Sequence, residues 1–140
     1  MIALRLVLDT NVIVSAALKP DGLQRTVLGI ATAKPASVYV TDAILAEYEI
    51  VLKRPELRIR KGLRLQFLQL IQSHVRKVHP KRLIRVASDP SDDKFLECAE
   101  AARADYLVTG NLRDFPRFWK CTKVITSREL VEIIAPHLSK

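Results

Sequence analysis

Short apolar runs alternate along this chain with longer segments in which apolar residues recur at helical spacing. The runs lie at residues 4–8, 37–40, 83–86, 106–109 and 123–125. Each has the length of a buried strand and stops at polar residues, which is typical of a parallel sheet. The segments of helical spacing lie at residues 12–18, 23–33, 42–54, 63–78, 90–103 and 128–137. We predict strands over the first set of ranges and helices over the second.

Capping residues mark the beginning of three of the predicted helices. Thr41 or Asp42 is placed to cap the third helix, because the side-chain oxygen of either residue can accept from the first free backbone N–H groups. Asp89 is placed to cap the fifth helix, and Pro90, which follows it, suits the first helical position. Ser127 is the predicted cap of the last helix.

Strands that alternate with helices predict an α/β fold with a parallel sheet and right-handed crossover connections. A chain of 140 residues is expected to form a single domain, over residues 1–140, that buries a core without disulfides or structural metals. Ligands of such sheets bind outside the carboxyl ends of the strands. Polar residues that directly follow the predicted strands are therefore the first candidates for chemistry.

Two single carboxylates stand out in this pattern. Asp9 lies where the first strand ends and the first helix begins, so it is either a ligand at the sheet edge or the helix cap. Glu47 falls within the apolar arc of the third helix, at about 100° per residue, whereas Glu49 falls outside it. An inward-facing acid needs a cation or a buried salt bridge, for which an arginine is one candidate.

A cluster of acids opens the fifth helix. Asp89, Asp92 and Asp93 lie within its first turn or just before it, where the helix dipole alone favours negative charge. Two adjacent carboxylates nevertheless exceed what a cap requires. Helical phase places Asp92 nearer the apolar stripe and Asp93 on its flank, so the sequence leaves open which of the two points into a site.

Polar residues also follow the fourth strand. Thr109, Asn111 and Asp114 lie after it and are expected at the same sheet edge as Asp9, although each can also serve in a turn or a cap. A parallel sheet brings the ends of its strands together. Four acid-bearing segments at strand ends or on adjoining helices therefore favour one shared site over coincidence.

Composition excludes several classes of protein and of site. An apolar content of 49% excludes an intrinsically disordered chain, and no apolar run approaches the ~20 residues of a membrane span. The beginning of the chain lacks the regions of a signal peptide. Two cysteines without zinc-ligand spacing predict reduced thiols and a cytoplasmic protein. No dinucleotide-binding, Walker A or nucleophile-elbow motif and no zinc-spaced histidine pair is present, so carboxylate chemistry remains.

The formal charge of +8 is unevenly distributed. Residues 53–85 contain 11 Lys and Arg against one acid, a net charge of +10, whereas the rest of the chain has 12 against 14, a net charge of −2. A solvated helix surface would explain such a segment, but a phosphate backbone is the polyanion that basic patches attract and hold. Carboxylates without His or Cys select hard cations such as Mg²⁺ or Mn²⁺, which promote displacement at phosphorus. The sequence thus predicts a metal-dependent phosphodiesterase, with single-stranded or looped RNA as substrate.

Four blocks of the sequence, taken together in order and spacing, resemble PIN-domain proteins. The blocks are Val7-Leu8-Asp9-Thr10-Asn11-Val12, Ile44-Leu45-Ala46-Glu47-Tyr48, Asp92-Asp93-Lys94-Phe95-Leu96-Glu97-Cys98-Ala99 and Ala104-Asp105-Tyr106-Leu107-Val108-Thr109-Gly110-Asn111. Within the family, the sequence is most similar to the branch of VapC-like toxin components of toxin–antitoxin systems. The resemblance implies a Rossmann-like three-layer sandwich with a five-stranded parallel sheet in the order 3-2-1-4-5. It also implies Mg²⁺- or Mn²⁺-dependent RNA cleavage, a homodimer and an antitoxin partner.

The resemblance carries site residues onto this chain. Asp9, Glu47 and Asp93 match the three main metal-site acids of the family, which implies that they are the catalytic and metal-binding residues. Asp92 is an adjacent metal-ligand candidate.

The fourth position of the family site departs from its usual pattern. Asn111 stands where an acid often stands in this branch, which would weaken a second metal site unless Asp114 supplies the missing ligand. Asn111 still offers a carbonyl oxygen, and Thr109 and Asn11 would support the acids or the scissile phosphate by hydrogen bonds.

The hypothesis that follows is a Mg²⁺- or Mn²⁺-dependent endoribonuclease in which water attacks the phosphodiester. RNA contacts are expected from Arg58, Arg60, Lys61 and Arg64. One alternative is a PIN-like module that binds RNA or a protein without cutting. Another is a phospho-accepting receiver domain, which requires an acidic pair after the first strand, whereas this chain has a single acid there.

Overall fold

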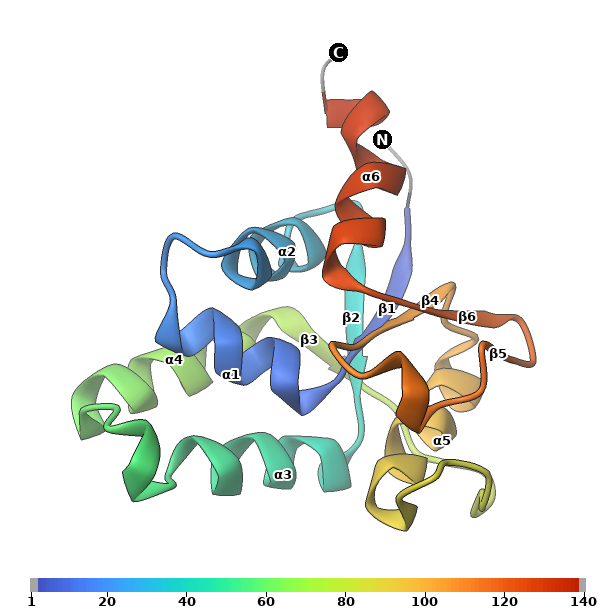
Figure 1. The fold of residues 1–140 in the computed structure, drawn as a ribbon, viewed down its shortest axis with the longest axis horizontal. Coiled ribbons are helices and arrows are strands. Elements are labelled where there is room, and N and C mark those ends of the chain that lie inside the picture. Colours follow the sequence, from blue (N-terminus) through green and yellow to red (C-terminus); the bar gives the residue numbers. More distant parts are fainter. Residues whose placement is uncertain (1–2, 139–140) are drawn as a thin grey trace.

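The computed structural model describes residues 3–138 and confirms the α/β fold (Figure 1). Within this range six strands form one sheet in the order β3-β2-β1-β4-β6-β5. The strands are β1 (Arg5–Leu8), β2 (Ser37–Val40), β3 (Val75–Lys77), β4 (Tyr106–Val108), β5 (Phe118–Trp119) and β6 (Thr122–Ile125). The helices are α1 (Thr10–Leu18), α2 (Leu23–Thr32), α3 (Asp42–Leu52), α4 (Lys61–His74), α5 (Asp93–Ala102) and α6 (Ser127–Leu138). Three short 3-10 helices connect them: η1 (Pro55–Leu57), η2 (Pro90–Asp92) and η3 (Leu112–Asp114).

Five of the strands are parallel, and their order matches the one expected. From one edge to the other they run β3, β2, β1, β4 and β6, which is 3-2-1-4-5 when parallel strands alone are numbered. The sheet has a sixth strand that was not expected. β5 is a two-residue antiparallel strand that pairs Phe118 with Lys123 and Trp119 with Thr122 beside β6.

The predicted position of the third strand is wrong. Residues 75–77, assigned from the sequence to the end of a helix, form β3, in which Val75 pairs with Val38 of β2. Val75 lies four residues after Ile71 and so fits the helical period of α4, which is why periodicity alone extends the helix over it. The backbone groups that β2 offers at the sheet edge end the helix at His74 instead.

The segment over residues 83–86, predicted as that strand, lies along α5 without pairing to the sheet. Its backbone is bound by side chains: the Ile84 N–H donates to Glu97 (3.1 Å) and the Val86 N–H to Asp93 (3.0 Å). Arg82 adds an ion pair to Glu100 at 2.8 Å. Asp93, Glu97 and Glu100 occupy positions i, i+4 and i+7 of one helix face. Asp93 and Glu97 accept from the backbone in place of a neighbouring strand, and Glu100 binds the Arg82 side chain.

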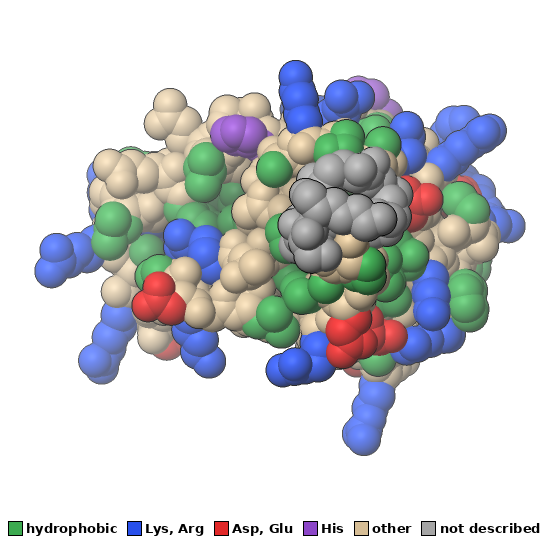
Figure 2. Space-filling view, turned by 90° about the horizontal axis from the view of Figure 1, so that it is seen from above, with side chains coloured by type: hydrophobic (Ala, Val, Ile, Leu, Met, Phe, Trp, Pro, Cys, Tyr) green, Lys and Arg blue, Asp and Glu red, His purple; other side chains and the backbone are tan. Residues whose placement is uncertain are grey.

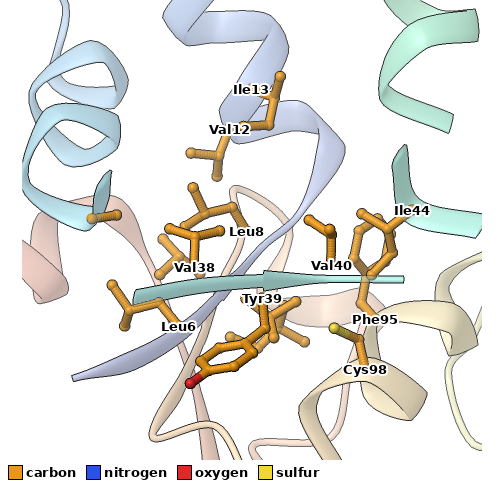
Figure 3. Close-up of a cluster of buried hydrophobic side chains, with 14 of the residues drawn as sticks. Leu6, Leu8, Val12, Ile13, Val38, Tyr39, Val40, Ile44, Phe95 and Cys98 are labelled. Carbon is orange, nitrogen blue, oxygen red and sulfur yellow. The ribbon is translucent and has the colours of Figure 1, made fainter. Parts of the chain in front are cut away.

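Helices cover both faces of the sheet, as a three-layer sandwich requires. α5 packs against β1, β2 and β4 on one face, and α2 packs against β2 on the other. The close-up in Figure 3 shows Val12 and Ile13 of α1 on one side of β2 and Cys98 of α5 on the opposite side. Burial raises the pKa of the Cys98 thiol to about 12, so this thiol acts as an apolar packing group.

Caps define the helix starts at three places. Thr41 caps α3 by accepting from the Ile44 N–H (3.2 Å), and Asp89 accepts from the Ser91 N–H (3.0 Å) ahead of α5, as expected. The cap of α6 is Thr126, so the prediction of Ser127 is wrong. Thr126 Oγ1 accepts from the Glu129 N–H (3.2 Å) and Glu129 accepts from the Thr126 N–H (3.1 Å), which is a capping box.

None of the helices within residues 3–138 has the length and apolar character that crossing a membrane requires.

Candidate active site

Asp9 lies at the carboxyl end of β1 and serves both of the roles considered for it. It caps α1, with Oδ1 accepting from the Thr10 N–H at 2.7 Å, and its Oδ2 accepts from the Thr109 hydroxyl at 2.7 Å. The residue is 6% exposed. Burial raises the pKa of the Asp9 carboxyl above its ordinary value, the two hydrogen bonds oppose that effect, and the nearby Glu47 and Asp114 raise the pKa further. The cap thus aims a desolvated carboxylate at the sheet edge.

Glu47 faces inward from α3, as its helical phase predicted. Its carboxylate accepts from the Thr10 hydroxyl and from the Lys94 ammonium group. The salt bridge considered for this residue therefore exists, but its partner is a lysine of α5 rather than an arginine. The side chains of Lys94 and Glu47 are 22% and 23% exposed. Beneath them the Tyr48 hydroxyl donates to the Leu8 carbonyl, which ties α3 to the end of β1.

Asp92 and Asp93 point to different places although they are neighbours. Asp93 is buried, and its Oδ1 accepts from the N–H groups of Val86 (3.0 Å) and Ala87 (2.8 Å). It lines a separate cavity beside that loop and is not among the residues that line the groove of Asp9. Asp92 ends the 3-10 helix η2 and lines the groove of Asp9. Because the chain changes from 3-10 to α geometry between them, extrapolation of one helical phase does not place these two side chains.

The carboxyl of Asp92 has the most perturbed acidity at this edge. Its pKa is raised to about 6, first by desolvation and then by the negative charges of Asp9, Asp89, Asp114 and Glu47. Carboxylates that raise one another's pKa are close together and insufficiently neutralised by the surrounding protein. The acids predicted from four separate segments therefore form one electrostatic cluster, with Asp92 in the place expected for Asp93.

The supporting residues predicted after β4 also reach this edge. The Thr109 hydroxyl donates to Asp9 and accepts from the Asn111 N–H at 3.0 Å. The Gly110 N–H donates to Asn11 Oδ1 at 3.1 Å. Asp114, on η3, lines the groove together with Asn11 and Asn111. The loop after β4 is thus tied to the start of α1, and Asp114 lies close enough to Asp9 to raise the pKa of its carboxyl.

The groove that these acids line extends away from the sheet between α1 and α3. Its volume is about 650 Å³, and the two helices run side by side in Figure 1. Apolar residues of both helices line it, among them Val14, Ala43 and Ile50, and so does Arg54. We call this the carboxylate groove; its acids are Asp9, Glu47, Asp92 and Asp114.

Two cations of the groove were missed by the sequence analysis. Lys94 lies within a block already singled out for its acids, and a lone cation directly after Asp92 and Asp93 was the available signal. Arg54 was counted with the basic segment, but nothing in its spacing indicated that it lines the groove. No carboxylate within residues 3–138 forms an ion pair with Arg54.

The donor set of the carboxylate groove fits a hard cation in its chemistry but is not drawn together around one. All four acids offer carboxylate oxygens, the ligands that Mg²⁺ and Mn²⁺ prefer. Within the described part of the chain, however, no three Asp, Glu, His or Cys side chains are close enough to hold a metal ion. The carboxylate of Glu47 is occupied by Thr10 and Lys94. Binding a cation through Glu47 would therefore require Lys94 to release this carboxylate.

The basic segment is only partly available for an RNA backbone. Arg58, Arg60 and Lys61 are exposed between η1 and the first turn of α4. Arg64 is half-buried, and its Nε has no hydrogen-bond partner among the described residues. The residue lines a cavity of about 350 Å³ together with Phe67. Elsewhere, Figure 2 shows Lys and Arg side chains around the outline of the face that carries α6.

Comparison with known proteins places the chain beside one family. A model described as the PIN domain matches residues 5–113. The uncharacterized protein MJ1680 of Methanocaldococcus jannaschii is 27% identical over 143 residues, which cover 94% of this chain and 92% of that protein.

Two solved structures share the fold. PAE2754 from Pyrobaculum aerophilum has a TM-score of 0.64 at 16% identity, over 96% of this chain and 91% of that one. VapBC2 from Rickettsia felis, bound to a DNA fragment from their promoter, has a TM-score of 0.62 at 18% identity, over 87% of this chain and 98% of that one.

Proposed function

Since the chain belongs to the PIN-domain family, we propose that it is a Mg²⁺- or Mn²⁺-dependent endoribonuclease and the toxin of a toxin–antitoxin pair. The observation that carries this proposal is the carboxylate groove, where four acids from separate segments meet at the carboxyl edge of the sheet. The fold shared with VapBC2 supports the toxin assignment.

The residues that would hold the metal are Asp9, Glu47, Asp92 and Asp114. A bound Mg²⁺ or Mn²⁺ ion supplies a Lewis acid that lowers the pKa of water and stabilises charge on a phosphodiester. Asp93 is assigned a structural role, because two backbone N–H groups already occupy one of its oxygens. This assignment exchanges the two neighbouring aspartates relative to the family resemblance.

The chain's own side chains prepare the site in two ways. Thr109 and the Thr10 N–H hold both oxygens of Asp9, so this carboxylate keeps one orientation when its environment changes. Lys94 neutralises Glu47; in a cluster of four acids this internal cation reduces repulsion until another positive charge replaces it. The site therefore includes its own exchangeable counterion.

The substrate proposed for the groove is single-stranded RNA. The acids, several apolar side chains and Arg54 line the same groove, and the exposed Arg58, Arg60 and Lys61 follow Arg54 in the sequence. Apolar surface beside a line of cations is the combination that accepts unpaired bases and their phosphates.

Two protein partners belong to the same proposal. We assign an antitoxin partner by analogy with the toxin branch, and a homodimer because Leu63, Leu65 and Leu70 of α4 are 59%, 50% and 45% exposed. Exposed leucines on one helix are typical of a surface that another protein covers. We place the protein, acting as a single PIN domain over residues 1–140, in the cytoplasm, where its two free cysteines, Cys98 and Cys121, stay reduced.

The deciding experiment is cleavage of RNA by the wild-type protein with Mn²⁺, with EDTA, and after the substitution Asp9→Asn. We expect cleavage in Mn²⁺ alone. Asp21→Asn is the matched control, because Asp21 is an exposed turn residue outside the groove. Cleavage that continues in EDTA and in the Asp9→Asn variant would show that the metal mechanism is wrong.

A binding module that does not cut is the second candidate. The occupied carboxylate of Glu47 favours it, as does Asn111 in place of an acid. Calorimetric titration with Mn²⁺ separates the two functions, because a pure binding module should show no Mn²⁺ site that depends on Asp9.

A further inference from the structure

A second cavity adjoins the carboxylate groove and has the opposite chemistry. Its volume is about 330 Å³, and none of its lining residues is an acid. It lies between the loop after β4 and the first turn of α6, and it shares Asn11, Ser15 and Asn111 with the carboxylate groove. We call it the donor cavity after the hydroxyl, amide and guanidinium groups that line it together with Val12 and Leu23.

Ser127 is the feature of this cavity that the fold does not explain. The residue is 5% exposed and lines the cavity, yet its hydroxyl has no hydrogen-bond partner within residues 3–138. The cap of α6 does not use it, since Thr126 fills that role. Among the described residues, the fully buried polar side-chain atoms without a partner are Arg64 Nε and Trp119 Nε1. The Ser127 hydroxyl is not one of them, so it is accessible from the cavity, where water or a ligand can bond to it.

Backbone donors point to the same kind of ligand. The first intrahelical bond of α6 is that of the Leu130 N–H to the Thr126 carbonyl (3.0 Å), and the Glu129 N–H is bound by the Thr126 hydroxyl. Among the described residues, the N–H groups of Ser127 and Arg128 therefore have no acceptor. Together with the positive end of the helix dipole, they favour an anion.

No acid lines the donor cavity, and the nearest negative charges lie across the shared wall, where Asp9 accepts from the Thr109 hydroxyl. Glu129 is the nearest acid along the helix, but Thr126 and Arg117 bind its carboxylate, the latter at 3.1 Å. Arg128 lines the cavity and has no ion pair with a described carboxylate. The net charge at this end of α6 is therefore positive.

We propose that the donor cavity binds a phosphate of the RNA chain next to the phosphate that is cut at the carboxylate groove. Ser127, Arg128 and the first N–H groups of α6 would bind its oxygens, and the shared wall of Asn11 and Asn111 would keep the two phosphates apart. The inference rests on the proposed function for the identity of the polyanion. It also accounts for Asn111, because an acid at that position would face the bound phosphate.

The test measures binding of a fluorescein-labelled single-stranded RNA in EDTA, where a metal-dependent enzyme cannot cut it, by fluorescence anisotropy. Ser127→Ala, Arg128→Gln and Asn111→Asp should each weaken binding about threefold to tenfold. Arg128→Gln should also lower the slope of log Kd against log salt by about one. An oligonucleotide with neutral methylphosphonate linkages should bind wild type and variants equally weakly.

Two substitutions outside both cavities serve as matched controls. Ser37→Ala, at the start of β2, and Arg103→Gln, after α5, should leave RNA binding unchanged. If the wild-type protein binds the RNA and the three variants bind it equally well, the donor cavity is not a phosphate site, although the proposed function stands. If the wild type does not bind the RNA, the proposed substrate is wrong and the inference fails with it. Arg128 is exposed, so its variant keeps the test valid should Ser127→Ala disturb the fold.

Discussion

Replacing Lys94 with glutamine should strengthen the binding of Mn²⁺. In the wild-type protein the Lys94 ammonium group occupies the carboxylate of Glu47, so an incoming cation must displace it. Glutamine keeps most of the side-chain length but carries no charge. The variant therefore removes an internal competitor without removing any of the proposed metal ligands.

The size of the effect follows from how far the pair is shielded from water. The two side chains are 22% and 23% exposed, so the pair lies between surface pairs, worth about 0.2–1 kcal/mol, and fully buried ones, whose disruption costs about 3–5 kcal/mol. We take about 1–2 kcal/mol for releasing Glu47. That free energy corresponds to roughly a fivefold to thirtyfold gain in Mn²⁺ affinity.

Calorimetric titration with Mn²⁺ at constant pH and ionic strength measures this gain directly. Lys77→Gln is the matched control, because Lys77 forms a 2.8 Å ion pair with Asp42 outside the carboxylate groove, and its Mn²⁺ affinity should equal that of the wild type. Unchanged or weaker Mn²⁺ binding by Lys94→Gln would refute the reasoning. It would mean that Lys94 supports the metal site rather than competing with the metal.

Three further predictions test the other assignments. Desolvation and neighbouring acids raise the pKa of Asp92 to about 6, so the Mn²⁺ affinity should fall below about pH 6, where protons compete for this carboxylate. Asp92→Asn should remove this fall from calorimetric titrations between pH 5 and 8. Without metal, the folded state binds this proton more tightly than the unfolded state, so Asp92 contributes a loss of stability as pH rises from about 4 to 6. Urea titrations of Asp92→Asn should lack this contribution, while the contribution of Asp9, whose pKa is also raised, should remain. Asp93→Ala should lower the free energy of unfolding, measured by urea titration, by about 2–3 kcal/mol, because the N–H groups of Val86 and Ala87 lose their acceptor. The folded fraction should keep its Mn²⁺ affinity, and loss of Mn²⁺ binding would return Asp93 to the metal site. Thr126→Ala should cost about 1 kcal/mol through loss of the α6 cap, whereas an unchanged thermal midpoint would contradict that role.

The elements of the fold were predictable where local pattern and tertiary need agree. β1, β2, β4 and β6 are buried apolar runs, and the sequence places them within a residue or two of their observed bounds. It failed at β3, because Val75 fits a helical period as well as it fits a strand. The pairing of Val75 with Val38, on a strand 37 residues earlier, decided between the two.

The site divides in the same way. Asp9 and Glu47 were predictable because a strand end and a helical phase each orient a single side chain. The choice between Asp92 and Asp93 was not predictable, because it depends on a 3-10 turn and on where the 86–87 backbone finds its acceptor. The sequence also could not show that the hydroxyl of Ser127 lacks a partner.

By itself, the sequence determined the fold class and the sheet edge that carries the acids, because apolar spacing and strand ends are local properties. The order of the parallel strands came from the family resemblance. Only the tertiary structure decided which acids share the groove, that Lys94 neutralises one of them, and that a cavity lined by donors adjoins it. These features depend on side chains that meet from segments such as α3 and α5, with Glu47 and Lys94 lying 47 residues apart. No local pattern encodes such a contact, because the packing of whole elements sets it.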